Sequence, residues 1–379
     1  MNNQNNTEAL NYHAQFKGKV GIQPLTQVNT SDDLNLAYTP GIGAPISEIQ
    51  NNPENAYKYT LKARSVAVVC NGTATLGLGD TGPLAALPVI EGKSALIKKF
   101  ANLDAFPLCI NETDPQAIIK FCKQIEPTFG AILLEDIKAP ECFEIERTLI
   151  KELNIPVFHD DQHGTAIVVL AGLINSMKIL NKNKEDLKVV INGAGAAGIS
   201  IAEQLHSFGI KNIVLLDSRG IISKNRPDLN KYKLEALEFT NSENIDGDLK
   251  TAIKDSNCFI GVSVANLLNA DDIQLMDEDS IVFALANPVP EIMPLEAKQG
   301  GAKIVATGRS DFANQINNIL VFPGILKGAV ENRVPKITRE MLVEASKNLA
   351  AVVENPSLEN IVPKAFDDGV IKAVTKAVS

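Results

Sequence analysis

The architecture follows from residues 131–161, which read AILLEDIKAPECFEIERTLIKELNIPVFHDD. An apolar run ends at Glu135-Asp136, a segment with helical apolar spacing follows, and a second apolar run ends at Asp160-Asp161. Strand, crossover helix and strand make a parallel βαβ unit, so both acidic pairs are expected at the carboxyl ends of neighbouring strands. Open α/β sheets bind ligands at that edge. The sequence therefore predicts a ligand site built around carboxylates.

Two pairs of carboxylates at one sheet edge favour a bound cation. Their all-oxygen chemistry selects a hard ion, Mg²⁺ or Mn²⁺. Solvated loop acids are the plainer alternative, and the alternation of side chains along a strand allows one member of each pair to face away. His159 and His163 flank the second pair. We expect these histidines to orient the loop or cap the following helix rather than bind the cation.

The composition limits the class of protein. The chain has 379 residues, enough for two domains, and its net charge of −9 argues against a nucleic-acid partner, which needs a basic face. Five cysteines without a C-x-x-C pair are typical of reduced cytosolic thiols. Residues 1–7 are Asn-rich and lack a signal-peptide pattern, and no apolar run approaches the roughly 18 residues of a membrane span. We therefore expect a soluble, cytoplasmic protein without a membrane partner.

The chain is predicted to be α/β with two domains. Residues 1–155 form an N-terminal α/β domain with the carboxylate site, and residues 156–379 form a doubly wound, Rossmann-type domain with C-terminal helices. Expected strands lie at 66–70, 103–110, 131–134, 155–158, 188–192, 212–216, 258–262, 281–285 and 303–307. Expected helices include 7–17, 114–124, 165–180 and a tail at 366–378, whereas 36–43 is expected to be loop.

A dinucleotide fingerprint opens the second domain. Gly193-Ala194-Gly195-Ala196-Ala197-Gly198 follows a strand and begins a helix. The first glycine permits a tight turn, the second lets backbone approach a pyrophosphate, and the third allows close helix packing. Asp217 closes the next strand, where an acid accepts a ribose 2′-hydroxyl. Together these features favour NAD or NADP over a structural glycine turn without a ligand.

Other candidates are weaker on the sequence alone. Gly77-Leu78-Gly79-Asp80-Thr81-Gly82 repeats the glycine spacing, but the strand before it already ends at residue 71, and Pro83 and Pro88 are expected to interrupt the next helix. It is interpreted as a binding-site loop. Lys93, one of 36 basic residues, would be assigned to the surface, and Tyr38 to packing.

Eight motifs occur in order between about residues 20 and 340. They are Tyr38-Thr39-Pro40-Gly41, Gly77-Leu78-Gly79-Asp80, Glu91-Gly92-Lys93, Leu134-Glu135-Asp136, Asp160-Asp161-Gln162-His163-Gly164-Thr165, Gly193–Gly198, Ala286-Asn287-Pro288 and Asn317-Asn318-Ile319-Leu320-Val321-Phe322-Pro323-Gly324. Together they resemble the malic enzyme family, and the size resembles its short bacterial form. The resemblance implies oxidative decarboxylation of L-malate to pyruvate and CO₂ with reduction of NAD(P)⁺.

The resemblance also implies catalytic roles. Lys93 is similar to the family's general base, which takes the C2 hydroxyl proton as hydride leaves for the nicotinamide. Tyr38 is similar to the general acid that protonates C3 of enolpyruvate, and Asp160 to an acid that tunes Lys93.

The ligand-binding residues come from the same resemblance. Glu135, Asp136 and Asp161 are similar to the family's metal ligands. Asn287 and Asn318 are similar to residues that hold the substrate carboxylate, with Asn287 also beside the cofactor. Longer members carry a malate-gripping arginine before the Gly-Leu-Gly-Asp motif, but residues 71–75 contain none, as in the short forms. A basic residue from elsewhere in the chain, or from a partner subunit, is expected to replace it.

Two other functions remain open at this point. A malolactic-type decarboxylase would keep NAD bound and release lactate, and its motifs would barely differ. A catalytically silent dinucleotide-binding regulator is disfavoured because Tyr38, Lys93 and the metal candidates are all present.

The assembly and the cofactor preference can also be anticipated. The arm around Tyr38 has too little apolar content to hold itself in place, and C₂ dimers are the commonest assembly. We expect a homodimer in which the arm packs on the partner and brings Tyr38 to the partner's site. Asp217 favours NAD, whereas Arg219 just after it favours a 2′-phosphate, so use of both cofactors is expected.

Overall fold

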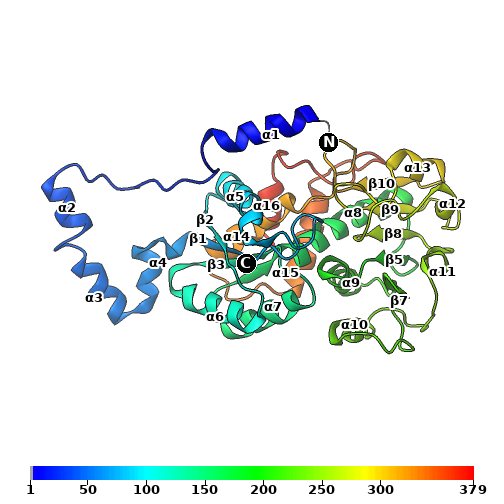
Figure 1. The fold of residues 1–379 in the computed structure, drawn as a ribbon, viewed down its shortest axis with the longest axis horizontal. Helices are drawn as coiled ribbons and strands as arrows, with labels where there is room; N and C mark the ends of the chain where they lie inside the picture. Colours follow the sequence, from blue (N-terminus) through cyan, green and yellow to red (C-terminus); the bar gives the residue numbers. More distant parts are fainter. Residues whose placement is uncertain (1–2) are drawn as a thin grey trace.

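The computed structural model describes residues 3–379 and the side chains from residue 7 onward. Met1 and Asn2, part of the stretch predicted to lack a signal sequence, lie outside the described residues. Two mainly parallel sheets lie side by side and are joined by one long helix (Figure 1). The predicted α/β fold class is therefore confirmed.

The first sheet has the strand order β2-β1-β3-β4, and all its strands are parallel. Helices α5 and α14 pack together on one side, and α6 and α7 pack together on the other (Figure 1). Because both faces are covered, β1 reads as a continuous apolar run. The elements are β1 (Ser65–Cys70), α5 (Gly82–Ala101), β2 (Asp104–Cys109), α6 (Pro115–Ile125), β3 (Ala131–Glu135), α7 (Glu141–Glu152), β4 (Val157–His159) and α14 (Phe322–Glu331).

The second sheet has the order β10-β9-β8-β5-β6-β7, in which only β7 is antiparallel. The chain runs from β5 to β6 on one side and returns to β8 on the other, which makes the end of β5 the topological switch point. Its strands are β5 (Lys188–Asn192), β6 (Asn212–Asp217), β7 (Gly220–Ile221), β8 (Cys258–Gly261), β9 (Ile281–Ala284) and β10 (Ile304–Thr307). Its helices are α9 (Ala196–Phe208), α10 (Lys231–Ala236), α11 (Leu249–Ile253), α12 (Ala270–Ile273) and α13 (Pro294–Gln299).

Helix α8 (Thr165–Leu180) joins the two sheets, as predicted, and follows a π-helical turn, η4 (Asp160–Gly164). Together they form a 21-residue helical segment that is long and apolar enough to cross a membrane by length and composition. The expectation that no segment approaches that length is therefore wrong. Because 67% of this segment's most apolar window is buried within the protein, it packs as a core helix.

Helix α5 contains both Pro83 and Pro88, so the prediction that these prolines interrupt the helix is wrong. Pro83 lies in its first turn, where a missing N–H costs little, and Pro88 lies inside it without ending it. Burial of Ile90 and Ile97 against the first sheet outweighs the proline penalty of about 3 kcal/mol. The helix therefore continues to Ala101 and carries Lys93 inward.

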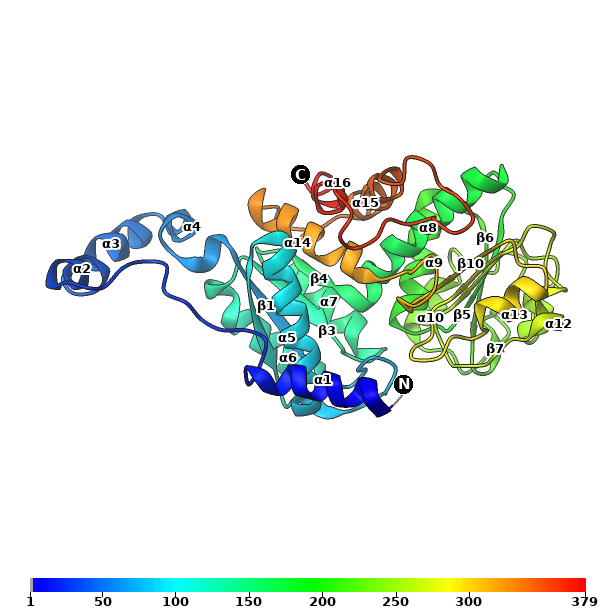
Figure 2. The same cartoon turned by 90° about the horizontal axis from the view of Figure 1, so that it is seen from above.

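The two ends of the chain also differ from expectation. The predicted loop at 36–43 is shorter, since α2 (Ser31–Ala37) and α3 (Gly43–Asn51) cover its ends. Helix α1 (Asn3–Gln15) begins earlier than predicted, and only α16 (Val370–Thr375) forms in the tail, after Gly369 in the left-handed conformation. Helices α14, α15 (Arg339–Ala351) and α16 pack together. They carry the end of the chain back to the first sheet (Figure 2). The domain boundary at 155/156 stays a prediction.

The arm formed by residues 20–60 extends away from both sheets in each view (Figures 1 and 2). Its helices are α2, α3 and α4 (Ala56–Tyr59), none of which has a buried residue. At its base, Arg333 pairs with Glu54 at 2.9 Å, and the Lys62 ammonium donates to the carbonyl of Phe129 at 2.8 Å. Where the arm begins, Lys19 donates to Glu91 and to the Pro88 carbonyl, so the described contacts hold the arm only at its base.

Candidate active site

The three predicted metal ligands meet at the carboxyl edge of the first sheet. Carboxylate oxygens of Glu135, Asp136 and Asp161 all lie within 4.8 Å of one another. Simple strand alternation would turn Asp136 away from Glu135, but Asp136 has left β3 with a φ of +53°. Its backbone N–H donates to Asp161 at 2.9 Å, which ties the two acidic pairs together.

The chemistry of these oxygens fits a divalent cation. Glu135 and Asp136 are almost fully buried, and each has one carboxylate oxygen without a hydrogen-bond partner among the described residues. Burial and the neighbouring Asp161 hold the pKa of Glu135 well above its usual range and raise the pKa of Asp136 to about 7. Such crowding of buried carboxylates is costly unless a cation compensates their charge, and oxygen ligands suit Mg²⁺ or Mn²⁺.

Lys93 projects from α5 into the same cluster. Its side chain is 9% exposed, so the surface assignment from sequence is wrong. The ammonium lies 2.5 Å from Glu135 Oε1, forms a second ion pair with Asp160 and sits 4.7 Å above the Phe322 ring. Burial lowers the pKa of Lys93, but Asp160, Glu135 and Asp161 outweigh burial and raise it.

Asp160 does not share the position of the three clustered acids. It is completely buried, pairs with Lys93, and keeps its second oxygen unpartnered among the described residues. Burial raises the pKa of Asp160 to about 6, against the opposing charge of Lys93. Asp160 and Asp161 are neighbours in the π-helical turn η4, but their side chains have different partners. Asp160 contacts Lys93, and Asp161 belongs to the carboxylate cluster.

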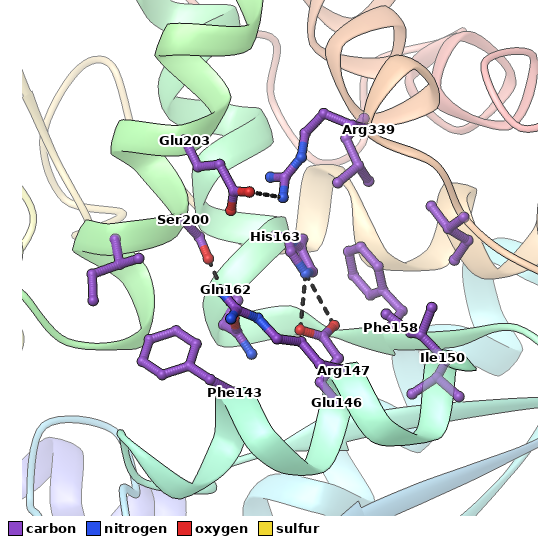
Figure 3. Close-up of a pocket in the computed structure, with 14 residues that line it drawn as sticks. Phe143, Glu146, Arg147, Ile150, Phe158, Gln162, His163, Ser200, Glu203 and Arg339 are labelled. Carbon is purple, nitrogen blue, oxygen red and sulfur yellow. Dashed lines mark hydrogen bonds and ion pairs between the residues drawn. The ribbon is translucent and has the colours of Figure 1, made fainter. Parts of the chain in front are cut away.

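The two histidines act on this segment through Glu146 of α7. His163 Nε2 lies 3.0 Å from Glu146 Oε1, and the backbone N–H of His159 donates to the same oxygen at 3.0 Å. Helix α8 has no side-chain cap, so the capping role is wrong. The ring contact of His163 with Glu146 (Figure 3) agrees with an orienting role, whereas the His159 ring has no hydrogen-bond partner among the described residues. Sequence reasoning missed Glu146, whose spacing on α7 resembles that of any charged helical residue.

The two asparagines lie next to glycines of the site segments. A Cβ added to Gly77 would meet the Asn287 carbonyl oxygen at 2.6 Å, so the glycine-rich loop of the first domain touches the Asn287 segment of the second. Asn318 begins the short helix η5 (Asn318–Leu320), and a Cβ on Gly164 would lie 3.1 Å from the Asn318 side chain. Asn318 therefore lies beside the η4 turn that carries Asp160 and Asp161, and Asn287 lies beside the glycine-rich loop of the first domain.

The glycine fingerprint has the geometry expected of a nucleotide-binding turn. Gly193 has a φ of +120°, and a Cβ there would lie 2.6 Å from the Val262 carbonyl oxygen. A Cβ on Gly198 would lie 1.7 Å from the Gly193 carbonyl oxygen, so only glycine allows α9 to pack this closely. Gly195 has open space and caps α9, which begins at Ala196 and Ala197 and has no side-chain cap, so its N-terminus suits a phosphate.

Asp217 ends β6 beside the fingerprint but is already paired. Its carboxylate accepts from Arg226 at 2.7 Å and from Lys233 at 2.6 Å, and although burial opposes the shift, these partners lower its pKa. Arg219 is 70% exposed and pairs with Asp228 at 3.0 Å, so its guanidinium does not contact Asp217. Sequence reasoning missed Lys233, which lies on helix α10, sixteen residues after Asp217.

Tyr38 is not near these groups within one chain. It lies between α2 and α3 on the protruding arm and is 64% exposed (Figure 2). The assignment to packing is wrong, and a single chain does not bring Tyr38 to Lys93.

Two family models match most of the chain. Residues 17–118 match the family model for the malic enzyme N-terminal domain, and residues 162–378 match the model for the malic enzyme NAD-binding domain. The chain belongs to the malic enzyme family. The enzyme therefore oxidatively decarboxylates malate with a nicotinamide cofactor.

Individual relatives agree with this family membership. The chain is 50% identical to a bifunctional malic/malolactic enzyme of Bacillus subtilis, over 98% of this chain and 92% of the relative. It is 44% identical to an NADP-dependent malic enzyme of Halomonas elongata, over 95% and 85%. Its fold matches the crystal structure of an NAD-dependent malic enzyme from Thermotoga maritima with a TM-score of 0.95, 49% identity and 98% coverage of both chains.

Proposed function

We propose that malate is oxidised at the cluster of Lys93 and the surrounding carboxylates, with Mg²⁺ or Mn²⁺ held by Glu135, Asp136 and Asp161. The observation that carries this proposal is a buried ammonium facing several buried carboxylate oxygens, some of them unpartnered. When bound, the cation supplies Lewis-acid polarisation of the substrate C2 oxygen.

Lys93 is proposed as the general base. Without a compensating cation, the neighbouring acids hold its proton firmly, because they raise its pKa. Neutralising those acids removes this stabilisation, and the burial of Lys93 then lowers its pKa toward neutrality. Lys93 can then take the C2 hydroxyl proton while hydride passes to the nicotinamide, and Asp160 holds the lysine in place.

The substrate and cofactor would lie between the carboxylate cluster of the first sheet and the glycine fingerprint of the second. Asn287 and Asn318 are proposed to donate to the malate carboxylate without adding charge to the site. The cofactor pyrophosphate would lie against Gly193–Gly198 at the start of α9, where Gly195 leaves open space.

Tyr38 is proposed to serve the partner subunit of a homodimer. The supporting observation is the arm, which projects from the body and exposes Leu34, Leu36 and Ile46 to at least 50%. Exposed apolar side chains do not stabilise a single chain, whereas contact with a partner subunit would bury them. In that arrangement, Tyr38 protonates C3 in the partner's active site.

Use of both NAD and NADP is proposed. Asp217 can accept a ribose hydroxyl, but Arg226 and Lys233 already offset its charge, so a 2′-phosphate meets cations as well as an acid. Relatives named for each cofactor support the same view. Arg219→Ala should weaken NADP⁺ binding more than NAD⁺ binding, and Asp217→Ala mainly NAD⁺ binding. Equal losses for both cofactors in each variant would refute this reading of the ribose site.

A cytoplasmic location is also proposed, supported by five cysteines that are all free among the described residues. Recovery of the native enzyme in a membrane or secreted fraction would contradict it.

The function is tested with purified enzyme, malate, either cofactor and Mn²⁺. We expect pyruvate and reduced cofactor in equal amounts, and loss of activity with a chelator that returned Mn²⁺ restores. Lactate without net cofactor reduction would instead indicate malolactic chemistry, which the bifunctional Bacillus subtilis relative makes the second candidate.

A further inference from the structure

Glu291 is a buried carboxylate of the second domain that takes no part in the proposed reaction. It lies between β9 and α13 and is fully buried, and no cation among the described residues contributes to its charge balance. Burial raises the pKa of its carboxyl, and backbone N–H donors oppose that shift. Because burying a carboxylate is costly unless such donors satisfy its oxygens, its hydrogen-bond partners indicate what the residue does.

Each carboxylate oxygen of Glu291 accepts a backbone N–H from a different loop. Oε1 accepts from Ser263, in the loop after β8, at 3.0 Å. Oε2 accepts from Ala286, in the loop after β9, also at 3.0 Å. Since β8 and β9 are parallel neighbours, both loops leave the same edge of the second sheet, where such sheets bind ligands. Glu291 therefore joins two neighbouring loops at the ligand-binding edge.

The surrounding backbone holds Glu291 in this position. The N–H groups of Leu267 and Leu268 donate to the Glu291 carbonyl oxygen at 2.7 and 3.0 Å. A Cβ at Gly261 would lie 2.4 Å from the Glu291 carboxyl carbon, so only glycine at the end of β8 leaves room for the carboxylate. The position of the carboxylate is thus fixed by contacts with both the loop and the strand that precedes it.

Each of the two loops also contacts a part of the proposed active site. In the loop after β8, the Val262 carbonyl oxygen would lie 2.6 Å from a Cβ added to Gly193, so this loop packs against the glycine fingerprint. Asn192 adds a hydrogen bond to Ser263 Oγ at 2.7 Å. The loop after β9 carries Asn287. One loop therefore borders the cofactor turn, and the other carries the amide proposed to bind malate.

We propose that Glu291 is a positioning residue whose carboxylate sets the loop that carries Asn287 relative to the loop that borders the cofactor turn. No contact with substrate or cofactor is assigned to Glu291 itself. A misplacement of about 1 Å in a substrate-binding group can lower a rate about 10²-fold, so the connection matters for turnover. This inference rests on the proposed role of Asn287 in malate binding.

Glu291→Gln tests the carboxylate. Glutamine keeps the size of the side chain but replaces one oxygen by an amide group that donates, so one of the two loop N–H groups loses its acceptor. With saturating NAD⁺ and Mn²⁺, we expect kcat/KM for malate to fall at least about tenfold. Glu243→Gln changes an exposed glutamate of the same domain and is the matched control, which should keep the wild-type kcat/KM.

The Mn²⁺ dissociation constant separates positioning from general damage to the fold. The carboxylate cluster shares no partner with Glu291, so Mn²⁺ affinity in Glu291→Gln should change less than about twofold. A loss of stability alone would lower the fraction of folded enzyme but not kcat/KM per folded molecule, which circular dichroism allows to be counted. A wild-type kcat/KM in folded Glu291→Gln would overturn the proposal, as would an equal loss of Mn²⁺ affinity.

Gly261→Ala displaces the same carboxylate without changing Glu291. The added Cβ would overlap the Glu291 carboxyl group, so we expect a similar loss in kcat/KM, at least about tenfold, with Mn²⁺ affinity retained. This variant keeps the test valid if Glu291→Gln does not fold. Wild-type kinetics in Gly261→Ala would contradict the positioning role.

A double-mutant cycle with Asn287→Ala tests whether Glu291 acts through Asn287. If it does, Glu291→Gln should lower kcat/KM by less than about threefold once Asn287 is already alanine. Two losses that multiply in full would overturn the proposal. Normal malate kinetics in Asn287→Ala alone would refute the proposed role of Asn287 and the positioning role with it. A loss in Asn287→Ala together with normal kinetics in Glu291→Gln would overturn the positioning role only.

Discussion

At the scale of single residues, Lys93 is the group on which the proposed chemistry depends. General acid–base groups contribute about 10²–10⁴-fold, so Lys93→Ala should lower kcat by that order while cofactor affinity changes little. Lys99→Ala, an exposed lysine on the same helix, is the matched control and should keep near-normal kcat. Steady-state kinetics and cofactor titration measure both. A near-normal kcat in Lys93→Ala would show that another group is the base.

The acidic cluster predicts how metal binding depends on pH. The pKa of Asp136 is raised to about 7, so below that pH a proton occupies a group that must be ionised to bind the cation. Mn²⁺ affinity should therefore fall as pH drops through 7, by up to about tenfold per unit. Asp161→Ala should weaken Mn²⁺ binding at every pH. Mn²⁺ titrations that show no dependence on pH between 6 and 8 would contradict this account.

At the scale of elements, the π-helical turn η4 places Asp160 against Lys93. A Cβ at Gly164 would lie 1.9 Å from Asp160 Oδ1, so Gly164→Ala should displace Asp160 and lower kcat at least about tenfold. Gly92→Ala is the control, since nothing lies within 4 Å of its added Cβ, and it should be neutral or stabilise α5 by about 0.5–1 kcal/mol. Kinetics and thermal unfolding separate the two effects. A normal kcat in Gly164→Ala would show that the geometry of η4 is not needed for catalysis.

The elements also show what sequence can and cannot predict. Local patterns identified the strand ends that carry Glu135 and Asp161, and the glycines that start α9, because these depend on period and turn chemistry. Lys93 was not identifiable from local pattern, since its burial comes from packing of α5 on a distant sheet. The left-handed backbone at Asp136, which turns that carboxylate into the cluster, is likewise a tertiary effect. The catalytic role of Lys93 was predicted only from the resemblance to the malic enzyme family.

At the scale of the whole molecule, the arm is the part of the chain whose proposed role requires a second subunit. Tyr38 lies on a projection that exposes apolar side chains and is anchored only at its base. Each subunit of a C₂ dimer would therefore lend its arm to the other. Tyr38→Phe should lower malate turnover by about 10²–10⁴-fold without changing the mass of the assembly. Light scattering that reports an active monomer would contradict the dimer.

The measurement that tests the shared active site most directly is complementation between two inactive variants. Lys93→Ala and Tyr38→Phe chains are coexpressed with different tags, and the mixed dimers are isolated and assayed for pyruvate formation. If Tyr38 acts in the partner's site, each mixed dimer holds one intact site and one doubly altered site, so about half of wild-type activity should return. If both residues act within one chain, every site carries a defect, and the mixed dimer would be as inactive as its parents.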